Sequence, residues 1–320
     1  SGSNWANKTD LGTLKADNTG HSTAYAVSDD ASVVVGSAEN DDNNYLPTYR
    51  ATVWSGNGWT TKTDLGTLRS DNSGSSSAYA VNSDGSVIVG QSEDDINPLG
   101  HAIVWSGSGW TTKTDLGTLR SDNSGQSIAR AVSRDGSIVV GKAGNNDHSE
   151  NRAVVWHGEN WGKKKDLGTL KADNSGFSEA YAVNEDGSVI GGWAENDNGE
   201  NHATIWSGSG WGTKTDLGAL KADNSGVSVV RGLSADGNFA VGFSDNDEVL
   251  FRAVVWNLRN LNNARPTDTA NTRASLSLLS ADTASLLAQR ARAAENLLGG
   301  CRADGGKFCY SAGYRRDIGH

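Results

Sequence analysis

The stretch GWTTKTDLGTLRSDNSGSSSAYAVNSDGSVIVGQSEDDINPLGHAIVW, residues 58–105, is one copy of a repeat that fills most of the 320-residue chain. The most regular part of the repeat is the string Asp-Leu-Gly-(Thr/Ala)-Leu, which occurs five times. The spacings between its copies are 54, 51, 51 and 50 residues, a period typical of the blades of β-propellers. The copies begin at Asp10, Asp64, Asp115, Asp166 and Asp216.

Four short apolar runs in each copy predict four β-strands. Each run alternates with period 2 and is too short for a helix, so a strand is favoured. Asp84-Gly85 separates the first two runs, and Gly-rich residues separate the last two; both tolerate the positive φ of hairpin turns. The repeat therefore predicts an all-β chain of antiparallel four-stranded sheets. In the quoted copy the runs cover residues 76–82, 86–91, 101–106 and 110–117.

Paired tryptophans fix the phase of the repeat and predict a closed ring. The chain begins with the second member of a pair alone, Trp5, and the repeats end with the first member alone, Trp256. We therefore predict a five-bladed β-propeller whose last blade is completed by the N-terminal strand from Trp5 to Gly12, since closure removes unpaired strand edges. The paired tryptophans are expected to be core wedges between blades. They are Trp54 and Trp59, Trp105 and Trp110, Trp156 and Trp161, and Trp206 and Trp211.

Composition argues against several classes of function. A formal charge of −10 disfavours nucleic acid as a partner. The sequence contains no run of about 18 apolar residues, so we expect no insertion into a membrane. No Gly-x-Ser-x-Gly elbow occurs, so we predict a protein that is not an enzyme and that needs no cofactor or metal. An acidic pair in the central channel, acting on sugars, remains the enzymatic alternative. No triad or metal-ligand spacing connects the six histidines His21, His101, His148, His157, His202 and His320.

The strand order places two different kinds of loop at opposite ends of each sheet. We call the end with the two tight turns the turn end. The loop end carries the long loop between the second and third strands and the Leu-(Lys/Arg)-x-Asp-Asn-(Ser/Thr)-Gly connection to the next copy. Variable loops on a rigid scaffold are where binding function usually lies, so we place the candidate binding surface at the loop end.

A basic residue repeats at the loop end, and an aspartate follows it two positions later. The pair is either a local charge pair or part of a ring of cations that binds a sulfated glycan. The long loops are acidic but lack the spacing of a calcium loop, so we expect them to be solvated rather than to bind calcium. The basic positions are Lys15, Arg69, Arg120, Lys171 and Lys221, and the acidic positions are Asp17, Asp71, Asp122, Asp173 and Asp223.

The third copy departs most from the others and is the first candidate for a partner-binding patch. Its long loop is nearly neutral, and Arg130 stands where other copies have Tyr25, Tyr79 and Tyr181. The alternative is neutral drift on a solvated surface. Trp193, which has no counterpart in other copies, is a second candidate contact. The other residues assigned to the patch are Arg134, Lys142, Arg152, Lys163, Lys164 and Lys165.

The composition changes after Trp256. A polar linker containing Pro266 precedes residues 269–298, whose apolar spacing predicts an amphipathic helix that ends at Gly299-Gly300. Cys301 and Cys309 suit a small disulfide loop in an exported protein; two free thiols are the alternative. We therefore divide the chain into a propeller at 1–257, a linker and helix at 258–300, and a small cysteine loop at 301–320.

Two resemblances to known families follow from these motifs. The unit Asp-Leu-Gly-Thr-Leu … Ala-x-Ala-Val-Asn-x-Asp-Gly-Ser-Val-x-Val-Gly … Ala-x-Val-Trp resembles the extracellular HAF-family repeat over about 255 residues. The chain departs from that family where its signature Phe is replaced by Ile103, Val154 and Thr204. The tail from Thr272 through Cys309 to Gly313 is similar to the helical linker and barrel start of type V autotransporters, which implies that 301–320 is the truncated start of a barrel.

These resemblances imply a secreted or surface-displayed passenger domain. The Lys/Asn/Asp-rich composition also resembles Bartonella autotransporters, a family that includes an angiogenic factor acting through a vascular endothelial growth factor receptor. The expected function is binding of a host cell-surface protein or matrix component through the loop end. A lectin-like adhesin for heparan sulfate, a structural spacer and a propeller glycosidase or lyase are the alternatives.

Overall fold

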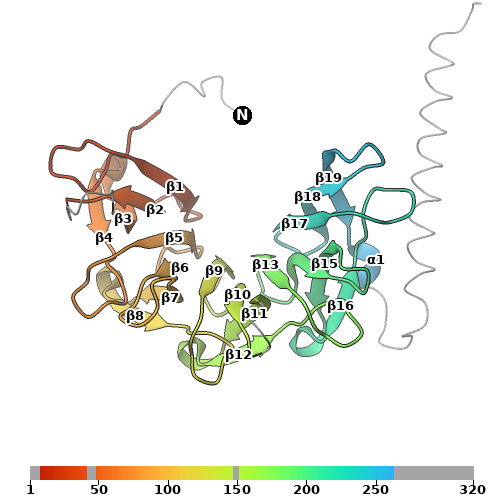
Figure 1. Ribbon diagram of the computed structural model, residues 1–320. Coiled ribbons are helices and arrows are strands. Elements are labelled where there is room, and N and C mark those ends of the chain that lie inside the picture. Colours follow the sequence, from red (N-terminus) through yellow and green to blue (C-terminus); the bar gives the residue numbers. More distant parts are fainter. Residues whose placement is uncertain (1–7, 42–47, 147–150, 263–320) are drawn as a thin grey trace, which may run out of the picture. The chain divides into compact units, whose positions relative to one another are not determined.

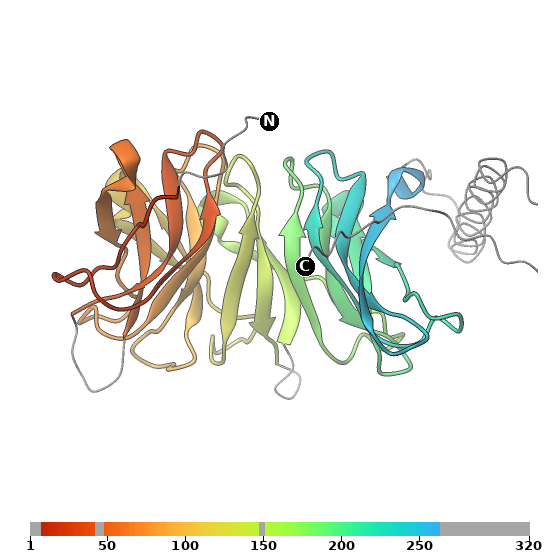
Figure 2. The same cartoon turned by 90° about the horizontal axis from the view of Figure 1, so that it is seen from above.

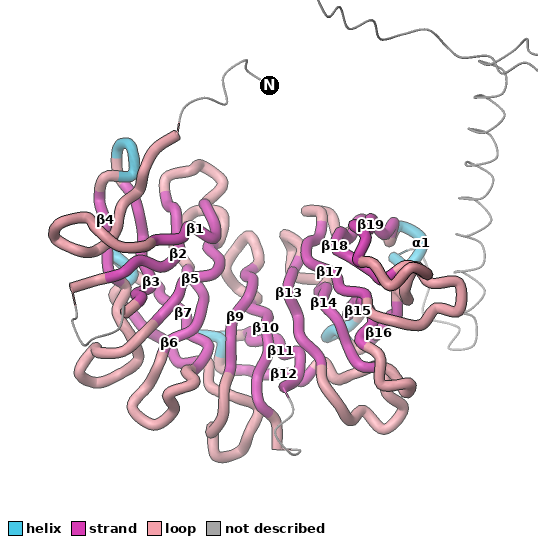
Figure 3. The backbone as a smooth tube through the Cα atoms, turned by 45° about the horizontal axis from the view of Figure 1, so that its top comes forward, coloured by secondary structure: helices cyan, strands magenta, loops and turns pink. Residues whose placement is uncertain are grey.

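The computed structural model describes residues 8–41, 48–146 and 151–262, and within them the chain is all-β apart from short helical turns (Figures 1 and 3). Five antiparallel sheets follow one another along the sequence, and in each the spatial order of the strands is their chain order. Sheet 1 contains β1 (Ser22–Val27), β2 (Val33–Glu39), β3 (Tyr49–Ser55) and β4 (Thr61–Asp64). Sheet 2 contains β5 (Ser76–Val81), β6 (Ile88–Ser92), β7 (His101–Ser106) and β8 (Thr112–Asp115).

The remaining sheets repeat this plan. Sheet 3 contains β9 (Ser127–Val132), β10 (Val139–Gly144), β11 (Asn151–His157) and β12 (Lys163–Asp166). Sheet 4 contains β13 (Ser178–Val183), β14 (Ile190–Glu195), β15 (Asn201–Ser207) and β16 (Thr213–Asp216). Sheet 5 has three strands within the described residues, β17 (Ser228–Leu233), β18 (Phe239–Asp245) and β19 (Phe251–Asn257), and the short helix α1 (Arg259–Asn262) follows it.

The strands predicted for the quoted copy are confirmed in number, order and pairing. The fourth strand is shorter than predicted, because Trp110 lies in a 3₁₀ turn at Ser108–Trp110 rather than in β8. Gly107 and Gly109, with φ of 74° and 65°, allow that turn. A β-bulge in the innermost strand of each sheet, as between Ala78 and Ala80 in β5, adds local twist.

Consecutive sheets pack face to face, and four apolar cores fill the interfaces between them (Figure 2). In the core between sheets 1 and 2, Val35 and Val53 meet Ala78 and Trp105, and all four are fully buried. Trp105, Trp156 and Trp206 lie in these cores, so the prediction that they are wedges between sheets is confirmed, and Trp54 is equally buried but belongs to none of the four cores. The four residues, each with 0% exposure, are Trp54, Trp105, Trp156 and Trp206.

The second tryptophan of each pair has a different role, which the sequence did not distinguish. Trp110 is half-buried, adopts a left-handed backbone conformation with φ of 56°, and donates its indole N–H to the carbonyl oxygen of Gly85 at 2.7 Å. That hydrogen bond joins the two tight turns of sheet 2. Bulky residues rarely adopt such a conformation, so the indole bond offsets backbone strain. Trp59, Trp161 and Trp211 make the equivalent bonds to Ala31, Gly136 and Gly187.

Backbone hydrogen bonds join the sheets at the turn end. The N–H of a residue in the first tight turn of each sheet donates to the equivalent carbonyl of the next sheet. Four such bonds run in series from sheet 1 to sheet 5: Asp29 to Ser83, Ser83 to Arg134, Arg134 to Glu185, and Glu185 to Ala235, at 3.0–3.2 Å.

Lysines of the outermost strands hold the connections at the loop end. The ammonium group of Lys113 in β8 donates to the carbonyl of Thr67 and to the side chain of Asn72, each at 2.8 Å. Both acceptors belong to the connection between sheets 1 and 2. Lys62, Lys164 and Lys214 make the same bonds to the connections before sheets 1, 3 and 4.

Sheet 5 keeps one face exposed within the described residues, whereas in sheet 1 the exposure is confined mainly to the edge strands, because β2 and β3 are almost fully buried. Val255 is 67% exposed and Val241 is 47% exposed in sheet 5, whereas their counterparts Val155 and Val140 in sheet 3 are fully buried. On sheet 1, β1 is mostly exposed, including Tyr25 at 49%. The predicted closing strand begins at Trp5, which lies outside the described residues, and no closed sheet is described.

The end of the described region differs from the predicted linker. Leu258 is buried and Leu261 packs against the core between sheets 4 and 5, so the compact unit reaches Asn262 rather than residue 257. The predicted helix at 269–298 and the pair Cys301 and Cys309 lie outside the described residues.

Candidate functional site

The loop end is built from two segments that each sheet holds side by side. The connection from the preceding sheet runs beside the start of the long loop. In sheet 2, for example, the N–H of Leu68 donates to the carbonyl of Glu93 at 3.2 Å. An aspartate side chain from the long loop caps the connection: Asp95 accepts the N–H of Ser70, and Asp197 accepts that of Ala172. The same bonds recur from sheet to sheet, so the side chains of the connection and of the first residues of the long loop can be compared directly.

The five repeated cations do not form a ring of free charges. Lys15 pairs with Glu39 at 3.1 Å, Arg69 with Glu93 at 3.2 Å, and Lys171 with Glu195 at 2.7 Å. The hydrogen bond between Lys15 and Glu39 lowers the pKa of the glutamate and raises the pKa of the lysine. Local charge pairing is thus the better of the two predictions. The partner, however, is a glutamate of the second strand and not the aspartate two residues along the chain.

Those aspartates serve their own loops. The carboxylate of Asp71 accepts the N–H of Ser73 at 2.8 Å, and these hydrogen bonds lower the pKa of Asp71. The pKa values of the four equivalent aspartates are lowered for the same reason, hydrogen bonding to the Ser or Thr two residues on. The equivalents are Asp17, Asp122, Asp173 and Asp223.

Sheet 3 lacks the carboxylate that pairs with the repeated cation in sheets 1, 2 and 4. Gly144 stands where the other sheets have Glu39, Glu93, Glu195 and Asp245. The backbone is unchanged, because Gly144 still donates to the carbonyl of Gln126 at 2.9 Å and accepts from Leu119 at 2.9 Å. Arg120 consequently has no ion pair among the described residues, and its buried Nε has no hydrogen-bond partner.

A second carboxylate is replaced nearby. Asn146 stands where other sheets have Asp41, Asp95, Asp197 and Asp247, and its side-chain oxygen still accepts the N–H of Ser121 at 3.1 Å. The loop geometry is kept while the charge is lost, so this corner of sheet 3 has two fewer negative charges than its counterparts. The sequence showed a nearly neutral third loop, but these two positions were missed. Aligning the five copies residue by residue would have found them.

The residues assigned to the third-copy patch do not share one surface. Arg130 lies on the innermost strand β9 and Lys163, Lys164 and Lys165 on the outermost strand β12, at opposite edges of sheet 3. Arg134 lies in a tight turn, at the turn end rather than the loop end. Arg152 is 2% exposed and pairs with Asp166 at 3.9 Å, so it cannot contact a partner.

Several of these side chains have structural partners. Glu179, itself buried, accepts from Arg130 at 2.8 Å and pairs with Lys142 at 3.6 Å. Arg130 also lies over the rings of Tyr79 and Tyr181, and it thereby continues a row of aromatic and basic side chains along the innermost strands. Lys164 makes the connection-holding bonds described above, and the ammonium group of Lys165 donates to the carbonyl of Gly210. Lys163 is exposed, and Trp193 in β14 is half-exposed.

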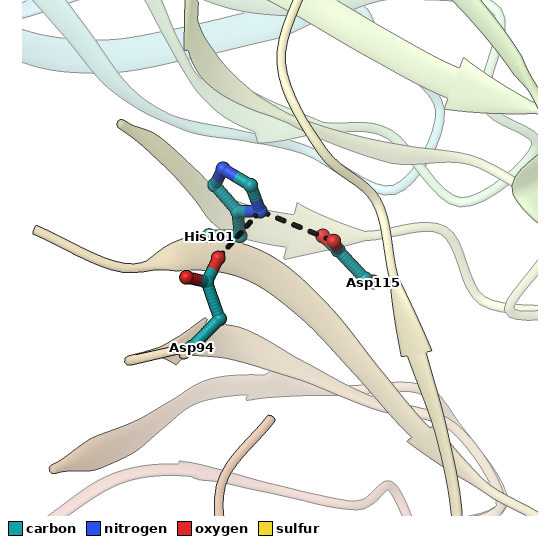
Figure 4. Close-up of side chains that lie close together, drawn as sticks. All are labelled: Asp94, His101 and Asp115. Atoms are coloured by element: carbon teal, nitrogen blue, oxygen red, sulfur yellow. Dashed lines mark hydrogen bonds and ion pairs between the residues drawn. The ribbon is translucent and has the colours of Figure 1, made fainter. Parts of the chain in front are cut away.

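One group of potential metal ligands occurs in the described part of the chain. The Nδ1 of His101 lies 3.0 Å from Asp94 and 3.1 Å from Asp115, with the imidazole between the two carboxylates (Figure 4). Burial lowers the pKa of His101, but Asp115 and Asp94 outweigh it and leave that pKa raised. Arg50 and Arg152 occupy the same position in sheets 1 and 3. Since a guanidinium does not ligate metals, the repeat requires a buried cation here, and we interpret His101 as that cation.

His202 takes the same position in sheet 4. Its Nδ1 lies 3.0 Å from Asp216, and Asp216 and Glu200 together raise its pKa against the lowering effect of burial. The aspartates of Asp-Leu-Gly therefore have two tasks. Besides pairing with the buried cation, Asp115 accepts the N–H of Gly117 at 2.7 Å, the turn-fixing role that its sequence predicts.

The turn end holds a depression of 290 Å³ lined by turn residues of all five sheets. Arg134 crosses it, bonding to Glu185 at 2.8 Å and pairing with Asp29 at 3.0 Å. The acidic side chains that line this depression are thus tied to a guanidinium and join sheets 1, 3 and 4. All three side chains are about half exposed, so the bridges contribute little stability.

Comparison with known proteins gives similarity of fold and no family. No protein-family model and no curated protein matches the chain. Among solved structures it is similar to TolB from Acinetobacter baumannii, at 11% identity and a TM-score of 0.47 over 74% of this chain and 52% of that one. A putative TolB from Agrobacterium tumefaciens has 10% identity and a TM-score of 0.45, covering 75% and 76% of the two chains.

A puromycin hydrolase mutant has 14% identity and a TM-score of 0.46 over 75% of this chain and 37% of that chain. This chain spans about half the length of the first TolB structure. Among the described residues, no helix has the length and apolarity needed to cross a membrane.

Proposed function

We propose that this domain is a binding module that recognises a partner through the loop end and does not catalyse a reaction. The observation that carries the proposal is the departure of sheet 3 from its siblings. The backbone bonds of Gly144 match those of its siblings, yet Gly144 and Asn146 remove two carboxylates, and Arg120 has no ion pair within the described residues. A buried donor without a partner costs free energy, and such a cost is expected where a surface is adapted to a ligand.

The charge pairs argue against the lectin-like alternative. A sulfated glycan wrapped around five cations needs those cations to be free, but Lys15, Arg69 and Lys171 already bond to glutamates. Breaking each pair would leave a carboxylate facing the sulfate. The proposal therefore favours a protein partner over heparan sulfate.

The ionisable groups argue against the enzymatic alternative. Within the described residues, His101 and His202 stand at a position that holds arginine in sheets 1 and 3 and pair with Asp115 and Asp216, and the acidic residues of the turn-end depression are bridged by Arg134. These groups have structural partners, so none of them is poised as a general acid or base. The resemblance to HAF-family repeats and autotransporter tails supports display of the domain outside the bacterial cell, as a passenger that meets a host cell-surface protein or matrix component.

We further propose that the five sheets form a closed propeller, in which sheet 5 packs on sheet 1 and the N-terminal segment supplies its fourth strand. The open face of sheet 5 carries Val241 and Val255, and the equivalent face of sheet 3 is buried against sheet 4. The row of aromatic and basic side chains along the innermost strands has Tyr25 of sheet 1 at one end and Arg231 of sheet 5 at the other. Arg231 lies over the ring of Tyr181 at 4.1 Å, and Tyr25 is exposed.

The contacts that recur between neighbouring sheets specify which groups would meet if sheet 5 packed on sheet 1. The N–H of Ala235 would donate to the carbonyl of Asp29 and complete the series of backbone bonds at the turn end. Lys8, which aligns with Lys62 and Lys113, would bind the carbonyl of Ala219 and the side chain of Asn224. Arg252 would pair with Asp10, as Arg152 does with Asp166.

Binding to endothelial and epithelial cell surfaces, measured by pull-down with and without heparinase, tests the proposed function. Binding that survives heparinase and is lost after trypsin treatment of the cells supports a protein partner. Loss of all binding after heparinase alone contradicts it and restores the glycan alternative. A wild-type domain that binds neither surface contradicts the binding proposal as a whole.

A further inference from the structure

The structure assigns to the loop end of sheet 3 a binding site for a carboxylate of an acidic segment on a protein partner, with Arg120 as the residue that receives it. This inference deepens the proposed function and rests on it. The carboxylate would take the place that a glutamate or aspartate of the chain itself takes in the other four sheets.

The cation of the site is held in position, and within residues 8–41, 48–146 and 151–262 it makes no ion pair. The guanidinium of Arg120 lies between Gly125 and Gly144: a Cβ built on either glycine would meet its Nε at 3.3 and 3.4 Å. Its Nη1 is 3.4 Å from the hydroxyl of Ser124, and its Nε is buried without an acceptor. The side chain is therefore oriented, and one of its donors is unsatisfied among the described residues.

The sibling sheets show what kind of group fits. In sheet 4 the carboxylate of Glu195 accepts from Lys171 at 2.7 Å and from the N–H of Phe177 at 3.1 Å. In sheet 5 the carboxylate of Asp245 accepts the N–H of Val227 at 3.2 Å. Gln126 is the equivalent residue in sheet 3. A carboxylate bound there would thus meet a guanidinium and a backbone N–H, both charge-complementary donors.

The charge around the site also favours an anion. In the siblings a second carboxylate, such as Asp95 or Asp197, lies at the start of the connection and would repel an incoming anion. Asn146 makes the same hydrogen bond in sheet 3 without a charge. Arg120 is thus the repeated cation at which both opposing charges have been removed, in a chain whose net charge is −10.

The size and shape of the place favour a carboxylate over a sulfate. The space is what remains when a Glu side chain is shortened to Gly, and a planar carboxylate pairs with a guanidinium through two parallel hydrogen bonds. Gly144 has no left-handed φ, and the nearest atom to a Cβ built on it is 3.4 Å away. A glutamate at this position is therefore tolerated, and the Gly144→Glu variant restores the sibling arrangement.

Propionate, which equals the missing glutamate side chain, is the probe for the site. The measurement is a titration of the ¹⁵N-labelled full chain, followed through the Nε–H signal of Arg120 and the N–H signal of Gln126. We expect saturable shifts of both signals with propionate and none with propionamide. Gly144→Glu and Arg120→Gln should each weaken propionate binding by more than about tenfold. Arg69→Gln, in which the removed cation already pairs with Glu93, is the matched control and should leave it unchanged.

Each outcome decides between named alternatives. Equal shifts in wild type and Gly144→Glu would overturn the site, and so would tighter binding of sulfate than of propionate at equal ionic strength. Misfolding does not confuse the result, because Gly144→Glu should raise the melting temperature while it abolishes binding. Tighter propionate binding after Asp147→Asn and Glu150→Gln would show that the chain supplies its own carboxylate, and would also overturn the proposal.

Cell binding separates this inference from the proposed function. If wild type binds cells and Gly144→Glu does not, both stand. If both proteins bind cells equally, the partner does not use Arg120 and the inference fails while the binding function stands. If wild type binds propionate but no cell surface, the proposed function fails although the anion site exists.

Discussion

Closure of the ring can be tested with one pentapeptide that occurs twice. Arg-Ala-Val-Val-Trp forms residues 152–156 in β11 and 252–256 in β19. Val155 is fully buried between sheets 3 and 4, whereas Val255 is 67% exposed on the open face of sheet 5. The two valines therefore have the same neighbours in sequence and different neighbours in space, and truncating each to alanine measures the difference.

The expected magnitudes follow from burial. Removing two buried methyl groups costs about 1.6 kcal/mol of transfer free energy, and the remaining cavity brings the cost of Val155→Ala to about 2 kcal/mol. On a face exposed to water, Val255→Ala removes only a third of that transfer term, about 0.5 kcal/mol. In a closed ring Val255 is as buried as Val155, so both substitutions should cost about 2 kcal/mol.

Thermal unfolding followed by tryptophan fluorescence distinguishes these cases. A loss of about 2 kcal/mol lowers the melting temperature of a domain this size by roughly 4–8 °C, and a loss of 0.5 by roughly 1–2 °C. We expect the two variants to shift it equally. If Val255→Ala lowers the melting temperature by only roughly 1–2 °C while Val155→Ala lowers it by roughly 4–8 °C, closure is refuted. Val255→Glu enlarges the contrast, because a buried carboxylate is much more costly than an exposed one.

Three further predictions concern joints that repeat around the domain. Lys8→Gln should lower the melting temperature as much as Lys113→Gln does, since both lysines hold a connection in the closed ring; an effect of Lys113→Gln alone would argue against a bound N-terminal segment. Ser178→Ala should cost about 1–3 kcal/mol in urea denaturation, because the buried hydroxyl accepts from Ala153 at 2.9 Å and donates to Gly168 at 2.7 Å. The exposed Ser209→Ala is its control, and equal costs would show that the bridge contributes nothing. The melting temperature should fall as the pH rises above 6.5. The pKa values of His101 and His202 are raised in the folded state, so their protonation stabilises the fold. This stabilisation is complete below pH 6.5 and is lost as the pH rises through the pKa values of the folded state. Replacing both by arginine, as at Arg50 and Arg152, should abolish that fall, and an unchanged pH profile would contradict the assignment of the histidines as buried cations.

The sequence determined the local structure of this protein because the signals for strands and turns are local. Period-2 apolar runs, Asp-Gly turns and the 50-residue period specify sheets of antiparallel strands and their order. The same reasoning placed the first tryptophan of each pair in the core. The second could not be placed, because a left-handed Trp110 held by Gly85 depends on the spacing of two turns in space.

Only the tertiary structure decided which side chains are free. The sequence shows five equivalent cations at the loop end. Whether each is paired depends on a residue about 24 positions away, which β-pairing brings beside it, as Glu93 is brought to Arg69. The patch proposed for the third copy failed for the same reason, because its residues share one segment of chain but lie at opposite edges and ends of a sheet.

The identical pentapeptides of β11 and β19 show this limit most directly. Their sequence specifies the same strand with the same alternation. Burial is a property of what packs against that strand, and the next sheet covers Val155 while the described residues leave Val255 open. Composition and period therefore determine the blade, and contacts between blades determine what each residue of it does.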